Sequence, residues 1–81
     1  MKPKRVLNLA KLNAGNAGTI VALHFEPALT ARLAALGFRI GKNIEVIRRG
    51  RFAGPLHVRI GSTDVMLRRR EARQIDVAIP A

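Results

Sequence analysis

The chain has 81 residues, of which 48% are hydrophobic, and its 15 Lys and Arg against five Asp and Glu give a formal charge of +10. This length and composition predict one small globular domain with a single core and exclude a disordered chain. The sequence contains no cysteine, which excludes disulfides, zinc ribbons, iron–sulfur clusters and thiol catalysis.

The N-terminal part predicts a basic tail, a turn and a strand. We expect residues 1–6 to form the tail and residues 7–81 to form a single domain. The glycines and asparagine within residues 15–18 indicate a turn. The β-branched and apolar run of residues 19–23 predicts the first strand. Because this run is almost continuously apolar, we expect the strand to be buried.

Membrane-spanning and secretory segments are not expected. No stretch approaches the ~20 consecutive apolar residues that a spanning helix needs. The basic residues at the start are not followed by an apolar run of signal-peptide length. The sequence therefore predicts a soluble, cytoplasmic protein without membrane insertion.

A short helix is predicted over about residues 27–36. Leu29, Leu33 and Leu36 recur at i, i+4 and i+7, which places the three side chains on one helical face. Pro27 suits the first helical position, where its missing N–H is no loss.

The residues after this helix predict an abrupt stop and a turn into a strand. Gly37 stands where a left-handed residue ends a helix, and Phe38 can fold back onto the last turn. Gly41 supplies a second point of backbone freedom before the strand that begins near Ile44. This junction specifies a fold more clearly than a chemistry.

The second half of the chain shows the period-two alternation of antiparallel strands. The expected elements are strands near 44–47, over 56–60, over 63–67 and over 75–79, a glycine-bounded loop at 50–55, a hairpin turn at 61–62 and one helical turn at 69–73. The chain is therefore mostly β, with about five antiparallel strands and one inserted α-helix. Rolling so small a sheet into a barrel removes exposed edges and encloses one core.

An ordered set of glycines, aliphatic and polar positions runs through about residues 7–79. Its members are Leu9, Leu12, Gly15, Gly18, Ile20, Arg32, Leu33, Leu36, Gly37, Phe38, Gly41, Ile44, Val46, Gly54, Pro55, Leu56, Leu67, Arg68, Glu71, Ala72, Ile75 and Val77. In this order they resemble the FeoA family of small accessory proteins of bacterial ferrous iron transport. The resemblance implies an SH3-like barrel with an inserted helix. It also implies a cytoplasmic protein that binds the GTPase-containing ferrous iron permease and modulates or assembles it.

Catalytic and metal-binding candidates are few. His57 alternates with apolar residues and is expected on the outer face of a strand. His24 lies two residues from Glu26, a pair that could share a metal ion, although such a histidine is more often a surface residue. The serine and threonines have no base beside them, and residues 15–19 lack the spacing and the lysine of a phosphate-binding loop. We therefore predict no enzyme activity, no cofactor and no metal site.

Two arginine clusters carry the candidate partner-binding site. They are Arg48, Arg49 and Arg51 beside Phe52, and Arg68, Arg69, Arg70 and Arg73. An apolar residue in a polar, glycine-flanked loop is either an anchor at an interface or a lid over one end of the barrel. The predicted partner-binding residues are Arg49, Arg51, Phe52, Arg69 and Arg70.

The net charge leaves the class of partner open. Nucleic acid, an acidic protein surface and anionic lipid headgroups all complement a charge of +10. A basic small-barrel protein that binds nucleic acid is therefore the alternative function. Against it, the sequence offers three Phe and no Trp or Tyr, which is few for a base-stacking platform.

Overall fold

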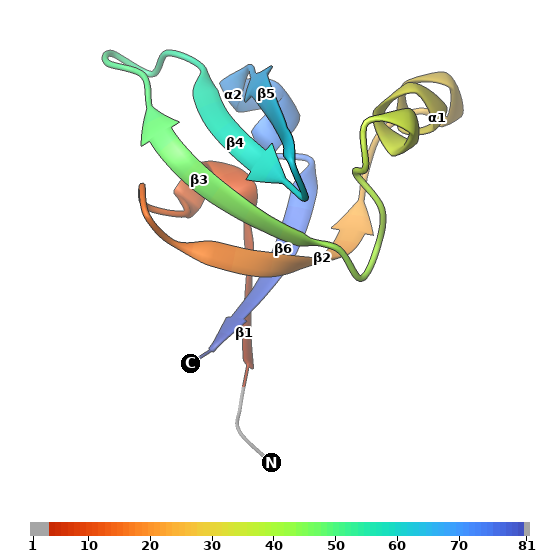
Figure 1. Cartoon of the computed structure of the whole chain (residues 1–81), viewed down its shortest axis with the longest axis horizontal. Helices are drawn as coiled ribbons and strands as arrows, with labels where there is room; N and C mark the ends of the chain where they lie inside the picture. The colour runs from red at the N-terminus through yellow and green to blue at the C-terminus, as the bar shows by residue number, and fades with distance from the viewer. Residues whose placement is uncertain (1–3, 81) are drawn as a thin grey trace.

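Six antiparallel strands carry the fold in the computed structural model, which describes residues 4–80 (Figure 1). The elements are β1 (Lys4–Asn8), the 3₁₀ turn η1 (Leu9–Lys11), β2 (Ala17–Leu23), α1 (Pro27–Ala35), β3 (Asn43–Arg49), β4 (Leu56–Ile60), β5 (Thr63–Leu67), α2 (Arg69–Ala72) and β6 (Ile75–Pro80). They form one sheet in the order β1-β6-β2-β3-β4-β5. Every pairing is antiparallel and α1 lies between β2 and β3, so the predicted mostly-β architecture with an inserted helix is confirmed.

The sheet has six strands instead of about five because the start of the chain pairs with its end. Lys4 lies opposite Pro80 and Asn8 lies opposite Asp76 in the β1–β6 pair. Residues 4–6, which we expected in a tail, therefore belong to the sheet, whereas residues 1–3 of that expected tail lie outside the described residues. Within residues 4–80, no helix is long and apolar enough to cross a membrane.

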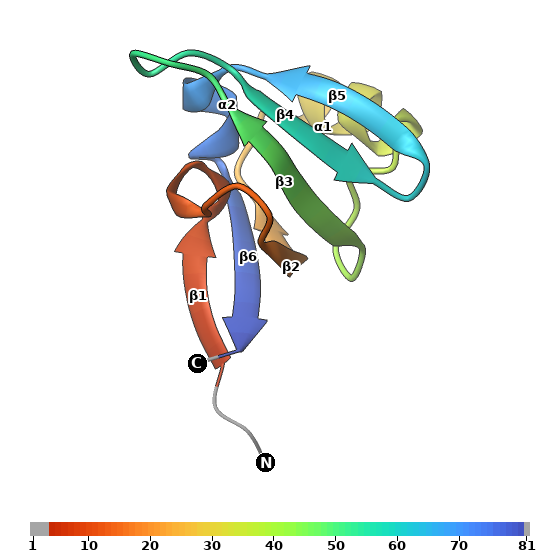
Figure 2. The same cartoon turned by 60° about the vertical axis from the view of Figure 1, so that its left-hand side comes forward.

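Two register shifts bend the sheet around its core. One lies in β2 between Ile20 and Ala22, and the other lies in β3 between Val46 and Arg48. Such bulges increase the local twist, and Figures 1 and 2 show the strands curling past one another. The expectation that the strand at residues 19–23 is buried is wrong in part, since Ile20 is fully buried while Val21 is 39% exposed.

The core is built from the inward positions of the strands, together with η1 and Phe38. Its largest fully buried side chains are Phe38, Leu9, Ile20, Ile44, Leu56, Ile75, Val46, Val58 and Val77. No polar or charged residue is buried with them among residues 4–80. Burial of apolar surface therefore holds the domain together, as its short length and lack of cysteine require.

The junction after α1 closes with a Schellman motif. The Phe38 N–H donates to the Leu33 carbonyl and the Gly37 N–H donates to the Ala34 carbonyl, each at 3.0 Å. Gly37 has a φ of 104°, the left-handed conformation predicted from the sequence. The motif turns the chain so that Phe38 enters the core.

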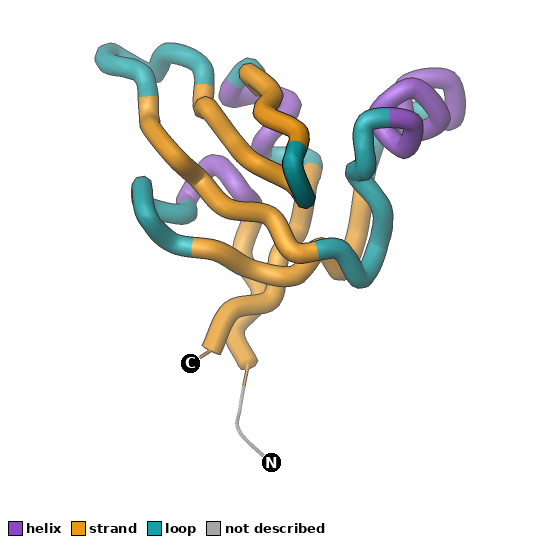
Figure 3. Tube along the Cα trace, in the orientation of Figure 1, coloured by secondary structure: helices purple, strands orange, loops and turns teal. Residues whose placement is uncertain are grey.

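The leucine face of α1 is less buried than its spacing predicts. Leu33 is buried and Leu29 is half-buried, but Leu36 caps the helix and is 44% exposed. Figure 3 shows α1 to one side of the curled strands. Most of this helix therefore faces away from the core.

Candidate docking surface

The loop between β3 and β4 has a narrow neck in which two glycines face each other. The Gly50 N–H donates to the Pro55 carbonyl at 2.8 Å, and the Gly54 N–H donates to the Arg51 carbonyl at 2.9 Å. A Cβ atom on Gly50 would lie 2.8 Å from the Pro55 oxygen, and one on Gly54 would lie 2.9 Å from the Arg51 oxygen. Both positions therefore need glycine, and these hydrogen bonds fix the loop.

The tip of this loop displays Phe52 to solvent. Phe52 and Ala53 have φ angles of 54° and 60°, and the hydrogen bond from Gly54 to Arg51 encloses them, as in a type I′ turn. That turn normally takes Asn-Gly, because residues with a Cβ atom are strained at positive φ. The Phe52 side chain is 99% exposed, so the alternative of a lid over the barrel is excluded.

Arg49 anchors the base of the loop. Its Nη1 atom donates to the carbonyl oxygens of Ala10 and Leu12, both at 2.7 Å. These carbonyls belong to buried residues of η1 and the segment after it, so the guanidinium ties β3 to the N-terminal part of the chain. Arg48 and Arg51, on either side, are exposed.

The second arginine cluster meets this loop in space. Leu56 pairs with Leu67, which brings the chain that follows β5 beside the end of the loop. A shallow groove of about 420 Å³ lies between them, lined by Ala53, Gly54, Pro55, Met66, Arg68 and Arg69. Figure 2 shows the β3–β4 loop and α2 at the same end of the molecule.

The predicted site residues in and beside α2 face two directions. Arg69 is half-buried on the groove, and its Nε atom has no hydrogen-bond partner. Arg70 is exposed and borders a different hollow, together with His24 and Glu26. The structure thus brings Arg69 close to the Phe52 loop and turns Arg70 toward a neighbouring face.

Sequence reasoning missed Met66 as a member of this surface. Met66 is 60% exposed and lines the groove, so it adds an apolar side chain beside the loop. The alternation of β5 places its side chain outside the core. Its position next to the loop depends on the pairing of β4 with β5, which no local signal encodes.

The two histidines pair with carboxylates that sequence spacing does not identify. His24 Nε2 lies 2.8 Å from Asp76 Oδ2, on the neighbouring strand, instead of beside Glu26. His57 Nε2 lies 3.1 Å from Asp64 Oδ2 on β5. Within residues 4–80, no group of three or more His, Cys, Asp or Glu is arranged to hold a metal ion.

Asp64 also holds the outer face of the β4–β5 hairpin through Arg59. Arg59 Nε donates to Asp64 Oδ1 at 2.6 Å and Arg59 Nη2 donates to Asp64 Oδ2 at 3.1 Å. The hydrogen bonds from Arg59, and then the proximity of His57, lower the pKa of Asp64 to about 2. This arginine is consequently engaged within the protein, unlike Arg48 and Arg51.

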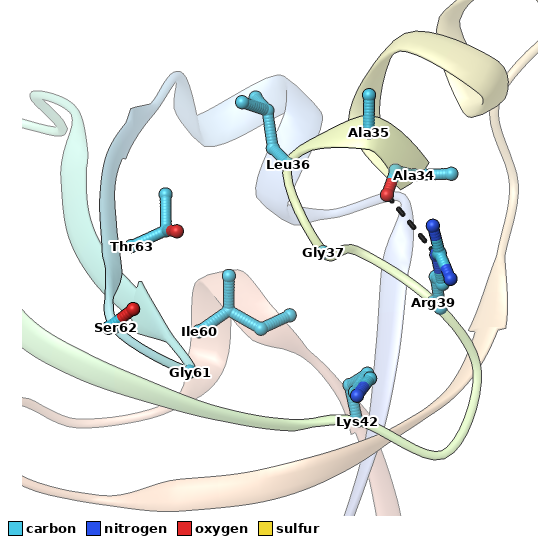
Figure 4. A pocket seen from close by; sticks show the side chains of 10 residues that line it. All are labelled: Ala34, Ala35, Leu36, Gly37, Arg39, Lys42, Ile60, Gly61, Ser62 and Thr63. Atoms are coloured by element: carbon cyan, nitrogen blue, oxygen red, sulfur yellow. Dashed lines mark hydrogen bonds between the residues drawn. The ribbon is translucent and has the colours of Figure 1, made fainter.

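A second hollow of about 290 Å³ lies between the end of α1 and the β4–β5 turn (Figure 4). Leu36 and Ile60 supply apolar side chains, and Arg39 and Lys42 lie at one edge, across from Ser62 and Thr63. The Arg39 Nε atom donates to the Ala34 carbonyl at 3.2 Å, which draws this side chain onto the helix end. The hollow therefore combines an apolar wall with a basic rim, away from the Phe52 loop.

A model of the FeoA domain matches residues 7–79. The chain belongs to the FeoA family. The resemblance expected from the ordered glycines and aliphatic positions is therefore confirmed over nearly the whole chain.

One FeoA relative is named a Fe(2+) transport protein A/Fe(2+) transporter FeoB fusion protein and comes from Porphyromonas gingivalis. It is 30% identical over 73 residues, which are 90% of this chain and 9% of that protein. The family is thus linked to ferrous iron transport, although this chain spans only a small part of that relative.

Solved structures of FeoA proteins share the fold. The solution structure of FeoA from Chlorobium tepidum has a TM-score of 0.82 at 28% identity, covering 91% of this chain and 70% of that one. The crystal structure of Stenotrophomonas maltophilia FeoA, described as a prokaryotic SH3 domain protein complexed with zinc, has a TM-score of 0.73 at 26% identity and covers 90% and 89% of the two chains. The SH3-like fold predicted from the sequence is thereby confirmed.

Proposed function

We propose that this FeoA-family protein is a cytoplasmic accessory of ferrous iron transport. In this proposal it binds the GTPase-containing ferrous iron permease, modulates or assembles it, and has no catalytic activity of its own. The observation that supports this most directly is the Porphyromonas gingivalis relative, in which transport protein A and the transporter FeoB are one polypeptide. A covalent link raises the effective concentration of two modules that act together. A separate chain of the same family is then expected to bind its permease without the link.

The proposed docking site is the arginine surface, which we define as Arg49, Arg51, Phe52, Arg69 and Arg70. Exposed aromatic and arginine side chains are enriched among the residues that dominate binding energy at protein interfaces. Within residues 4–80, Arg59 is the one arginine that forms an ion pair with a carboxylate. Arg51 and Arg70 are exposed and keep their charge available, whereas the Arg49 guanidinium is held by two backbone carbonyls. Acidic side chains of a partner would complement it.

The test is a pull-down at near-physiological salt, with the soluble GTPase region of the permease and total cellular RNA offered together. The parent chain should capture the GTPase region, and RNA should be lost after a nuclease wash. Phe52→Ala should weaken capture about thirtyfold, as expected for an aromatic hot spot, and Arg51→Ala and Arg70→Ala should weaken it less. Arg49 is left unchanged because its internal hydrogen bonds stabilise the fold.

Arg32→Ala is the matched control, since it removes one exposed arginine from α1, far from the loop in Figure 1. Equal losses for Arg32→Ala and Arg51→Ala would show that net charge, and not the arginine surface, governs binding. Loss for Arg32→Ala alone would assign docking to α1 instead.

Nucleic-acid binding remains the second candidate because of the formal charge of +10. Salt dependence does not separate it from an acidic protein partner, since both contacts weaken as salt rises. A competition experiment separates the two functions, because purified GTPase region should displace RNA from the parent chain. Capture of a discrete RNA set without the GTPase region would overturn the accessory function.

A further inference from the structure

We propose that the β3–β4 loop binds the surface of an anionic lipid bilayer. Phe52 would enter at headgroup depth, and Arg48, Arg51 and Arg68 would contact lipid phosphates. This contact differs from membrane-spanning insertion, for which residues 4–80 offer no suitable helix. It also goes beyond the proposed function, because it requires a lipid surface and no permease.

The shape of the loop suits contact with the surface of a bilayer. The Gly50–Gly54 neck carries a single projecting ring that is 99% exposed, so the apolar group stands free of neighbours. An aromatic side chain flanked by basic residues is typical of elements that lie in the membrane interface. The rigid loop also reduces the entropy lost on binding.

The backbone of the tip supports a binding role. Phe52 and Ala53 adopt positive φ angles in a turn that Asn-Gly would form without strain. A side chain with 99% exposure contributes nothing to the core, so folding does not explain its place there. Strained backbone of this kind concentrates at functional sites. The strain is consistent with a loop that must present an apolar ring.

The charges along the loop itself have one sign, whereas Glu71 lies beside Arg68 and accepts its backbone N–H at 2.9 Å. Residues 48–56 contain three arginines and no acidic residue. Arg48, Arg51 and Arg68 are exposed, and the nearest acidic residue of β3, Glu45, lies opposite Arg59 of β4 at the other end of the strand. Guanidinium groups bind phosphate oxygens bidentately, and anionic membranes attract such clusters.

The distribution of aromatic residues disfavours RNA as the ligand of this loop. Binding to single strands relies on successive aromatic side chains on which bases stack. Phe38 is fully buried in the core and Phe25 is half-buried against it. Phe52 is therefore the one exposed phenylalanine, which suits a single apolar anchor better than a stacking platform.

The chain contains no Trp or Tyr, so Phe52→Trp places the single tryptophan at the proposed contact. Its emission is measured with vesicles of phosphatidylcholine alone and of equal parts phosphatidylcholine and phosphatidylglycerol, with and without brominated acyl chains. We expect a blue shift and quenching by bromine on the anionic vesicles only. Ile40→Trp is the matched control, because Ile40 is an apolar loop residue that is 68% exposed near the other hollow; its emission should not change.

Vesicle co-sedimentation then measures the individual contributions. Phe52→Ser should weaken binding to anionic vesicles at least tenfold. Arg48→Ala, Arg51→Ala and Arg68→Ala should each weaken it about fivefold, with the effect disappearing at high salt. Arg32→Ala, the control of equal charge, should remain within about twofold of the parent.

Four outcomes would overturn the proposal. They are no binding to anionic vesicles, binding of the Phe52→Trp variant without a shift in its emission, a shift for Ile40→Trp instead, and a shift caused by polyglutamate or RNA but not by vesicles. The last would limit the loop to docking a protein or a nucleic acid, without a lipid surface. Failure here is distinguishable from failure of the proposed function, since these assays contain no permease and the pull-down contains no lipid.

Discussion

Phe38 and Phe52 are both phenylalanines, but they lie in opposite settings. Phe38 follows a glycine that adopts the positive φ angle, and its side chain is fully buried. Phe52 itself adopts a positive φ angle, and its side chain is 99% exposed. At Phe38 the local sequence, the backbone conformation and the packing of the core all favour the same structure. At Phe52 the backbone is strained and the core gains nothing.

This difference separates the part of the chain that makes the fold from the part that is available for a partner. Natural sequences are locally consistent with their structure, and departures from that consistency concentrate at functional sites. By this criterion the β3–β4 loop, with its exposed apolar tip and adjoining arginines, is the strongest functional candidate.

Truncation of the two phenylalanines should give very different stabilities. Phe38→Ala leaves a cavity in the core and should lower the free energy of unfolding by about 3–5 kcal/mol. Phe52→Ala should change it by no more than about 0.5 kcal/mol. Urea denaturation followed by circular dichroism measures both changes in the free energy of unfolding. If Phe38→Ala does not fold, Phe38→Leu replaces it in the comparison. Similar losses at the two positions would contradict the contrast.

Neighbouring arginines at the base of the loop should also differ. Arg49→Ala removes two charge-assisted hydrogen bonds to buried residues and should lower the free energy of unfolding by about 1.5–3 kcal/mol. Arg48→Ala is the matched control and should change it by less than about 0.5 kcal/mol, because Arg48 is exposed. The same denaturation experiment applies. A stable Arg49→Ala variant would show that the anchoring contacts are dispensable.

Exchange of glycine and alanine should have opposite signs at the two sites. Gly37→Ala forces a side chain into φ 104° and should lower stability by about 1–2 kcal/mol. Its Cβ atom would lie 3.6 Å from Ile60, so the loss would come from the backbone and not from a clash. Ala53→Gly relieves strain and should raise stability by up to about 1 kcal/mol. Thermal unfolding of the two variants, each compared with the parent, measures both changes in stability. Changes in the same direction would contradict this expectation.

The smallest effect concerns Asp64, which is exposed yet paired. Its pKa in the folded state is about 2, because Arg59 donates to the carboxylate and His57 lies 3.1 Å from it, and about 3.9 is usual for an unfolded chain. A lowered pKa stabilises the folded state above about pH 4, and this contribution is lost as the pH falls toward 2. Parent and Asp64→Asn should therefore differ slightly in stability at pH 5 and converge near pH 2.

Titration of the Asp64 carboxyl carbon by NMR gives the midpoint directly. A midpoint near 4 would show that Arg59 does not hold this carboxylate in solution. Arg59 would then be as free as the arginines around Phe52.

Local signals in the sequence predicted much of the fold. Strands at residues 56–60 and 63–67, the helix from Pro27 and the left-handed Gly37 agree with the structure because each depends on neighbours in the chain. The strand β1 was missed because it lies at an edge of the sheet and exposes Val6 at 62%. Alternation is weak evidence where neither face is fully buried.

The candidate site was predictable in its residues but not in its arrangement. The glycine-flanked Phe52 and the two arginine clusters are visible in the sequence. Their meeting across the groove requires the long-range pairing of Leu56 with Leu67. The anchoring role of Arg49 requires the carbonyls of Ala10 and Leu12 to lie within hydrogen-bond distance of β3. Tertiary contacts of this kind have no fixed spacing along the chain.

The pairing of Lys4 with Pro80 has a practical consequence for experiments on this protein. The first and last described strands begin and end side by side, at the opposite end of the molecule from the Phe52 loop (Figures 1 and 2). An affinity tag or a flexible tether that enters the described domain at Lys4 or leaves it at Pro80 does so at this one place. Immobilisation by either terminus should therefore orient the domain in the same way, with the β3–β4 loop pointing outward toward whatever is offered to it.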